Sequence, residues 1–524
     1  EKAREHLQMA WDAGYREPRA AFALALVLGR QYQEQLLEAE RIPAVDQREA
    51  RRKQNDATLR TPVLAYLRQA RGAEVPSPAY LEALMAFYEG RLDESLQRLK
   101  VLEDELPWFY EAPLLRGSLL QARAWKWWNQ GQREAALADF ATGRQDLALA
   151  AASGRSAPAV YAAAAELELN ALVMEKYGQG QVQAAFERGM SAVKKALSAQ
   201  PDHVPSLILQ AALLGDLADA RTNRGENADG LIQEAVAAAK KAQEAGPARA
   251  DARIALGKAY YQWGNARQDQ NLDPTAQLQL GLEAFESLSA EKRDYTVENH
   301  LGLIHQTWSE FEEQRGRDAS GHLDGAIAAY ERATRMDPYL LPAWINLGTC
   351  LHQRATLPRG PHPEKDLAAA LQVLEQARTL NPKHFVPYFV EGKVLFSRAL
   401  REQDRGGNPE PDLLRSVEAN RRGLAINASM PHLHNGIGVA QLQLARYAWE
   451  TGRDPGPFLA RADGAFRQAT AVAPGQVLGW VNLGDLLIWK ARHGQGAQPL
   501  SMLQEAETVL RRALGASPGD LAAQ

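Results

Sequence analysis

AWINLG at residues 343–348 and GWVNLG at residues 479–484 are nearly the same phrase, written 136 positions apart. Six letters can coincide by chance, so the phrase matters only if the rest of the chain follows the same spacing. A fixed period of about 20–50 residues is typical of arrays in which one small unit is repeated and stacked. The positions of small residues and prolines along the chain show whether such a period exists.

Gly348, the last residue of the first phrase, has an equivalent every 44 to 48 residues, and each equivalent is Gly or Ala. We call these positions the anchor residues. They are Gly117, Ala165, Ala211, Gly257, Gly302, Gly348, Gly392, Gly438 and Gly484. Ala83 and Gly29 are weaker equivalents upstream. Nine anchors in phase indicate that the phrase belongs to a long internal repeat.

Other residues follow the same period. A proline often lies ten residues before an anchor, as Pro338 does before Gly348, and small residues lie twelve and five residues before that proline. The residue eight before it is often bulky, as in Tyr330, Leu374, Phe466 and Leu510. Small residues seven apart share one helix face and let another helix approach, whereas proline stops a helix. Each repeat is therefore predicted to be two antiparallel helices that bury their apolar faces by stacking.

The complete motif resembles the tetratricopeptide repeat (TPR). One copy comprises Trp344, Leu347, Gly348, Ala370, Leu374, Ala377 and Pro382, and another comprises Trp480, Leu483, Gly484, Ala506, Leu510, Ala513 and Pro518. The resemblance covers residues 75–516 well and residues 1–74 loosely. It implies an all-α fold, an α–α superhelix or TPR-like solenoid of about eleven antiparallel helix pairs.

The repeats of this chain are longer than the 34 residues of the family. Only the step from Ala83 to Gly117 has that length. Most anchors are followed, ten to fourteen residues later, by a glycine suited to a helix C-cap. These glycines are Gly131, Gly178, Gly225, Gly316, Gly360, Gly406, Gly452 and Gly494. We expect a first helix longer by about two turns, polar connectors such as residues 403–412, and a second helix lengthened to match.

The repeat pattern divides the chain into four segments. Residues 1–74 are expected to hold a half-repeat and a divergent repeat, and residues 75–148 TPR-like repeats. Residues 149–516 form the regular elongated array, and residues 517–524 the start of a further helix or a tail. Neither end shows the polar capping element that natural arrays usually carry, so we expect truncation at one or both ends.

A second resemblance concerns the N-terminal part. The stretches GYREPRAAFALALVLG at 14–29, LAYLRQARG at 64–72 and LPWFYEAPLLRG at 106–117 are similar to repeat arrays attached to some bacterial serine/threonine protein kinases. This resemblance implies an attached kinase domain. The sequence itself has no Gly-rich ATP loop, HRD or DFG motif, so kinase activity would have to lie outside it.

The composition restricts the function. A net charge of −4 over 524 residues lacks the basic excess typical of proteins that bind nucleic acids or membrane surfaces. The single cysteine, Cys350, allows neither an intrachain disulfide nor a cysteine-based metal site. The longest apolar stretch, residues 20–29, is about half a membrane span. We expect a cytoplasmic protein without nucleic-acid binding or membrane insertion.

Catalytic motifs are absent from the sequence. It contains no Walker loop, no GxSxG, no HExxH and no Cys/His cluster. His432 and His434 are two residues apart and lie on different helix faces, which suits surface or packing histidines better than a metal pair. We therefore expect no enzyme activity, no cofactor and no metal.

The TPR resemblance implies that the first helices line a concave groove for a peptide or a partner protein. The implied positions lie close to each anchor, mainly two before, one after, and four or five after. They carry Asn299, Asn346, Asn435, Asn482, Lys258, Lys393, Thr349, Asp485, Gln262, Gln306, Gln353 and Gln443. Asn346 and Asn482 can bond a peptide backbone through amide and carbonyl, although Asn is also simply common at this place in the family.

Three functions remain open at this point. The leading interpretation is a non-catalytic scaffold that binds a protein or peptide and forms the interaction arm of a larger signalling protein. The alternative is a regulatory or substrate-recruiting region of a serine/threonine protein kinase whose catalytic domain is not in this chain. A third is a self-associating array, because exposed repeat ends can stack on one another.

Overall fold

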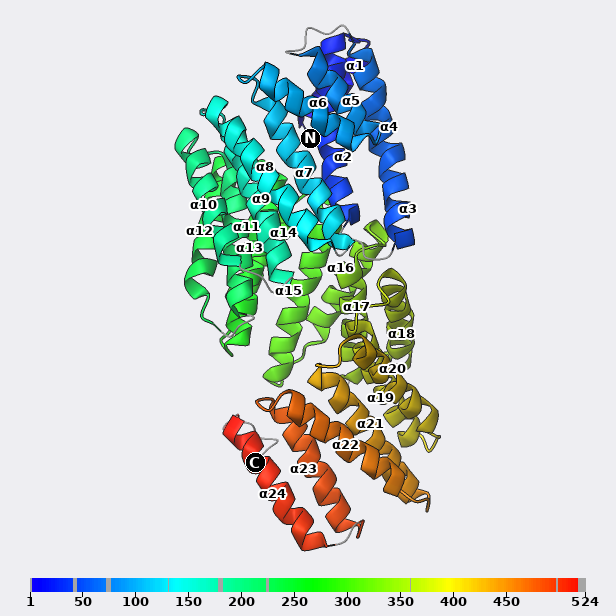
Figure 1. Ribbon diagram of the computed structural model, residues 1–524. Helices are drawn as coiled ribbons and strands as arrows, with labels where there is room; N and C mark the ends of the chain where they lie inside the picture. Colours follow the sequence, from blue (N-terminus) through cyan, green and yellow to red (C-terminus); the bar gives the residue numbers. More distant parts are fainter. Residues whose placement is uncertain are drawn as a thin grey trace. The chain divides into compact units, whose positions relative to one another are not determined.

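The computed structural model describes residues 2–40, 45–71, 77–130, 132–177, 182–222, 226–358, 360–495 and 498–516. Within these ranges the regular structure is entirely helical, with no strand (Figure 1). The chain divides into two compact units, Glu1–Phe311 and Glu312–Gln524. The segment boundaries expected from the sequence stay predictions, and residues 517–524 lie outside the described part.

The first unit begins with less regular helices. α1 (Lys2–Asp12) precedes α2 (Pro18–Glu40), which packs against α3 (Val45–Asn55), a π-helical turn η1 (Asp56–Arg60) and α4 (Thr61–Gln69). Five helix pairs follow: α5 (Pro78–Tyr88) with α6 (Leu92–Glu105), α7 (Glu111–Asn129) with α8 (Arg133–Ser153), α9 (Pro158–Tyr177) with α10 (Val182–Ala199), α11 (Val204–Thr222) with α12 (Asp229–Ala245), and α13 (Ala250–Asp269) with α14 (Thr275–Glu286). A 3₁₀ turn η2 (Ala290–Lys292) leads into α15 (Tyr295–Gln314), which runs past the end of this unit.

The second unit has the same kind of helix pairs. α16 (Ser320–Met336) is followed by α17 (Leu341–Thr356) with α18 (Pro363–Leu380), α19 (Val386–Asp404) with α20 (Glu410–Ile426), α21 (Pro431–Glu450) with α22 (Gly456–Val472), and α23 (Val477–Arg492) with α24 (Pro499–Ala516). Each second helix also packs against the first helix of the next pair, and the first helices pack on one another. The described residues therefore confirm the expected all-α array of antiparallel pairs, and the helices α1 to α24 among them suit the expected number of about eleven pairs (Figure 1).

At the anchor glycines, the bulky residue of the second helix packs directly on the first helix. A Cβ atom on Gly348 would lie 2.9 Å from Leu374 Cδ2, and one on Gly438 would lie 2.3 Å from Phe466 Cε1. Leu374 and Phe466 are fully buried. The bulky residue of the second helix thus fills the space that the missing side chain leaves, which explains why the anchors are Gly or Ala.

The expected lengthening of the helices is confirmed. In the one repeat of 34 residues, α5 has 11 residues and α6 has 14. In the longer repeats α7 has 19 residues and α8 has 21, and α21 has 20 and α22 has 17. Most first helices thus gain about two turns at 3.6 residues each, whereas α17 and α23, with 16 residues each, gain less. α14, with 12 residues, is an exception among the second helices.

Four of the five expected C-cap glycines that the structure describes adopt the left-handed conformation that such a cap requires. The φ angles of Gly316, Gly406, Gly452 and Gly494 lie between 62° and 77°. The prediction was wrong at Gly360, because α17 ends earlier, where Leu357 is extended before Pro358. Gly131, Gly178 and Gly225 lie outside the described residues.

Candidate functional site

The candidate site lies in the second unit, where α19 packs against α21 and α21 against α23. Side chains of these first helices and of α20 enclose a pocket of about 460 Å³, which we call the α19–α23 pocket. Its apolar lining comes from Phe389, Phe396, Val439 and Leu478. A concave pocket with apolar walls and a few polar groups is the usual form of a ligand site.

Three of the predicted groove residues meet in this pocket, one from each first helix. They are Lys393 of α19, Asn435 of α21 and Asn482 of α23. The amide Nδ2 of Asn482 donates a hydrogen bond of 3.1 Å to Oδ1 of Asn435. Asn435 is 6% exposed, and this bond holds the two side chains of successive repeats in one orientation.

Asn420 of α20 is a buried polar residue of this pocket that the sequence analysis missed. It is 1% exposed, and its Nδ2 donates to the carbonyl oxygen of Ser416 at 2.8 Å. Its Oδ1 is buried with no hydrogen-bond partner among the described residues. A buried acceptor without a donor lowers the free energy of unfolding by about 1–3 kcal/mol. A donor from outside the protein would remove this cost.

A signal for Asn420 was nevertheless present in the sequence. It occupies the repeat position that is Leu374 in one neighbouring repeat and Phe466 in the next. A polar residue at a position that elsewhere fills the core departs from the pattern. Glycines surround it: a Cβ on Gly392 would lie 2.3 Å from Asn420 Nδ2, and one on Gly436 would lie 2.6 Å from its Oδ1.

Charge and aromatic rings complete the pocket. Lys393 is exposed, and its Nζ lies 5.8 Å from the ring centroid of Phe389, within the range of a cation–π interaction. The ring of His432 lies 5.9 Å from that of Phe389. Burial, followed by the nearby Lys393 ammonium, lowers the pKa of His352 to about 4, so this histidine is neutral and Lys393 is the local positive charge.

The other predicted residues of the second unit lie outside the pocket lining. Asp485 is exposed and bound to Arg446 at 2.7 Å. The amide of Gln443 donates to Gln403 at 2.7 Å, and the hydroxyl of Thr349 donates to a carbonyl of its own helix at 3.0 Å. Gln353 has a buried Oε1 without a hydrogen-bond partner among the described residues, and Asn346 is partly buried.

The remaining predicted residues belong to the first unit. Gln306 donates to Glu310 at 3.0 Å, and Asn299 has a buried Oδ1 without a partner among the described residues. Gln262 bonds the carboxyl of Asp219. Lys258 is partly buried and contributes, after burial, to lowering the pKa of His300 to about 3. Lys258 and Lys393 therefore lie in different units.

Across the ranges that the structure describes, no group of three or more His, Cys, Asp or Glu side chains could hold a metal ion. No helix among the described residues is long and apolar enough to cross a membrane.

The fold is a helical-repeat solenoid, and the α19–α23 pocket lies among three of its first helices and α20. No protein-family model and no curated protein matches the sequence. Among solved structures, yeast Tom70 is similar with 12% identity and a TM-score of 0.37, over 88% of this chain and 89% of that chain. The human IFIT1 dimer with m7Gppp-AAAA has 13% identity and a TM-score of 0.37, over 85% of this chain and 92% of that chain.

A third similar structure is TTC0263, a thermophilic TPR protein of Thermus thermophilus. It has 18% identity and a TM-score of 0.30, over 42% of this chain and 94% of that chain. These similarities concern the helical-repeat architecture only.

Proposed function

We propose that this protein is a non-catalytic interaction scaffold that binds a peptide segment of a partner protein in the α19–α23 pocket. The observation that supports this most is the buried Oδ1 of Asn420, which has no donor among the described residues and stands where other repeats place an apolar side chain. A polar side chain at such a position lowers the stability of the core unless a ligand donates a hydrogen bond to it.

The pocket suits an extended peptide. A backbone N–H that enters beside Gly392 and Gly436 supplies the donor that Asn420 lacks, and the amides of Asn435 and Asn482 offer further bonds. An apolar peptide side chain packs on Phe389 and Leu478, and Leu478 is 53% exposed without a ligand. Lys393 favours an acidic group at the edge.

Several finer expectations remain proposals. These are the role as the interaction arm of a larger signalling protein, a cytoplasmic location, an attached serine/threonine kinase domain that this chain regulates, and self-association through exposed repeat ends. A kinase partner would fit the same pocket if it offered an extended segment, so identification of the bound peptide also separates these alternatives.

Peptide selection tests the proposal. A random phage-displayed library is selected on the whole chain, and the affinities of the selected peptides are measured by calorimetry. We expect Asn420→Leu to weaken binding by roughly tenfold or more, because it removes the acceptor. The stability should stay the same or rise by about 1 kcal/mol, because a buried polar atom without a partner is removed.

A matched pair of variants provides the control. Asn482→Ala changes the pocket, whereas Asn346→Ala changes the equivalent residue of α17 outside the pocket lining. We expect only Asn482→Ala to weaken binding. Peptides that bind Asn420→Leu and Asn482→Ala as tightly as the unaltered protein would refute the proposal.

A further inference from the structure

The one short repeat of the array leaves a notch between its longer neighbours. α5 has 11 residues, whereas α2 has 23 and α7 has 19. α2 also packs against α7. A repeat of the longer kind would continue α5 past the turn at Gly90 and fill this space. Instead a pocket of about 340 Å³ lies there, which we call the short-repeat notch.

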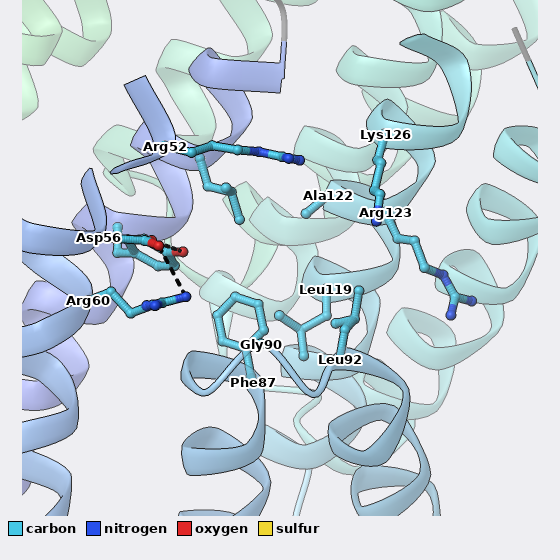
Figure 2. A pocket seen from close by; sticks show the side chains of 12 residues that line it. Arg52, Asp56, Arg60, Phe87, Gly90, Leu92, Leu119, Ala122, Arg123 and Lys126 are labelled. Atoms are coloured by element: carbon cyan, nitrogen blue, oxygen red, sulfur yellow. Dashed lines mark hydrogen bonds and ion pairs between the residues drawn. The ribbon is translucent and has the colours of Figure 1, made fainter. Parts of the chain in front are cut away.

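The notch has an apolar floor and charged walls. Phe87, Leu92 and Leu119 line it at the level of the α5–α6 turn. Figure 2 shows Arg52 reaching from one wall across the pocket towards α7, which carries Lys126 on the opposite wall. The side chain of Lys126 is exposed and that of Arg52 is partly buried.

The first wall is shaped by the π-helical turn η1. The backbone N–H of Thr61 donates to the carbonyl of Asp56, five residues earlier, instead of four. π-helical turns of this kind are frequently found at functional sites. Arg52, Asp56 and Arg60 follow one another at intervals of four residues, so they share the face that lines the notch.

The carboxylate of Asp56 orients this wall. It accepts a hydrogen bond of 3.0 Å from the Tyr32 hydroxyl, and its other oxygen lies 3.2 Å from Nη1 of Arg60 (Figure 2). Burial, and then this carboxylate, raise the pKa of Tyr32 above its ordinary value, so the tyrosine remains a donor. The Arg60 side chain is 34% exposed, and its Nε has no hydrogen-bond partner among the described residues.

Positive charge predominates in the notch. Arg52, Arg60, Arg123 and Lys126 line it, and Asp56 is the one carboxylate among the lining residues that the structure describes. Arg123 has a structural role, because its guanidinium makes two bonds of 2.8 Å to Asp139. Arg52 and Arg60 on one wall and Lys126 on the other are the other cations of the notch. Each guanidinium has five N–H donors, so Arg60 can bond an anion in addition to its pair with Asp56 at 3.2 Å.

We propose that the short-repeat notch binds a phosphorylated serine or threonine side chain of a partner peptide. A phosphoryl group carries a charge of about −1.5 to −2 and three acceptor oxygens, so it needs several donors from different directions. Two guanidinium groups and an opposing ammonium supply them, whereas one guanidinium would satisfy a carboxylate. The apolar floor accepts the side chains next to the phosphorylated residue.

Oriented peptide libraries test this proposal on the whole chain. One library has a fixed central phosphoserine or phosphothreonine, the second has the unmodified residue, and the third has Glu in its place. We expect the first library to be retained roughly tenfold better than the others. Retention should fall as salt is added, because exposed charges are screened, and millimolar inorganic phosphate should compete only weakly.

Two variants and a control locate the binding. Lys126→Glu reverses a charge of the notch, and Ala122→Phe fills it without a change of charge. Lys194→Glu makes the same change of net charge on the exposed face of α10. We expect loss of the phosphopeptide with the first two variants and retention with the third, at unchanged melting temperature.

Equal retention of the phosphorylated and Glu libraries would overturn the assignment, and so would full retention by either notch variant. Efficient competition by inorganic phosphate would likewise contradict the assignment of a phosphorylated peptide as the ligand. The phosphopeptide test of the short-repeat notch is independent of the α19–α23 pocket. Peptides selected for that pocket should bind the Lys126→Glu variant as tightly as the unaltered protein.

Discussion

Arg123 and Arg354 show how single residues join neighbouring repeats. Each lies six residues after its anchor and bonds an aspartate 30 residues earlier, Asp93 in one case and Asp324 in the other. Each also forms a two-bond pair with an aspartate of its own second helix, as Arg354 does with Asp366 at 2.6 and 2.9 Å. The recurring spacing was visible in the sequence, but only the structure shows that it is a bridge.

Arg354→Leu should destabilise the second unit by about 2–4 kcal/mol, because it leaves the Asp366 side chain, which is 4% exposed, without its partner. Urea denaturation followed by circular dichroism measures this. The double variant that also carries Asp366→Leu should regain most of the lost stability, because the uncompensated buried charge is then removed. Arg422→Leu, which breaks an exposed pair with Glu418, should cost less than about 1 kcal/mol.

Helix ends and lengths are set at the scale of the element. Gly452 ends α21 with φ 71°, and the N–H of Arg453 donates to the carbonyl of Ala448 at 2.7 Å. The same arrangement recurs with Asn271 at the end of α13, where φ is 57°. The connectors that follow are tied to the preceding repeat, as Arg453 is to Glu410 at 2.9 Å. These connectors therefore contribute to the stacking of neighbouring repeats.

Gly452→Ala should destabilise the second unit by about 1–2 kcal/mol, because a side chain is strained in the left-handed region. Gly464 provides the opposite case within α22, where a Cβ would meet nothing within 4 Å. Gly464→Ala should stabilise by about 0.5–1 kcal/mol, because glycine is entropically costly inside a helix. Thermal unfolding of both variants measures the difference, and equal shifts of the same sign would contradict this account.

At the scale of the whole molecule, burial is spread along the array. One apolar cluster lies at the N-terminal part of the first unit, and a separate cluster between α21 and α24 contains Phe466 and Leu483. Because each repeat packs only on its neighbours, stability is transmitted over short distances. The loss of stability caused by a core substitution should therefore be confined to its own repeat and the adjacent repeats.

Phe466→Ala should cost about 3–5 kcal/mol in its own region, because it removes a fully buried ring from above Gly438. Hydrogen exchange measured by mass spectrometry should show faster exchange in α21 to α24. Exchange in α7 to α12 of the first unit should not change. Uniformly faster exchange along the chain would show that the array unfolds as one cooperative body.

The local pattern of residues was sufficient to predict the helical-repeat solenoid. Helix pairs, their order and their lengths follow from spacings such as that between Ala370, Ala377 and Pro382, because these act within one helix or between sequential helices. The sequence pattern also predicted the residues that pack on the anchor glycines, because Gly348 and Leu374 belong to the same helix pair. Gly360 failed because a proline nearer to the helix ended it first.

The binding sites required the folded array. Asn435 and Asn482 are 47 residues apart, and only lateral packing of α21 on α23 brings their amides together. The orphan Oδ1 of Asn420 and the notch beside α5 likewise depend on how neighbouring helices of unequal length and side-chain size fit. Sequence spacing specifies what one helix does along its own axis, whereas the space left between helices is decided by all of their side chains at once.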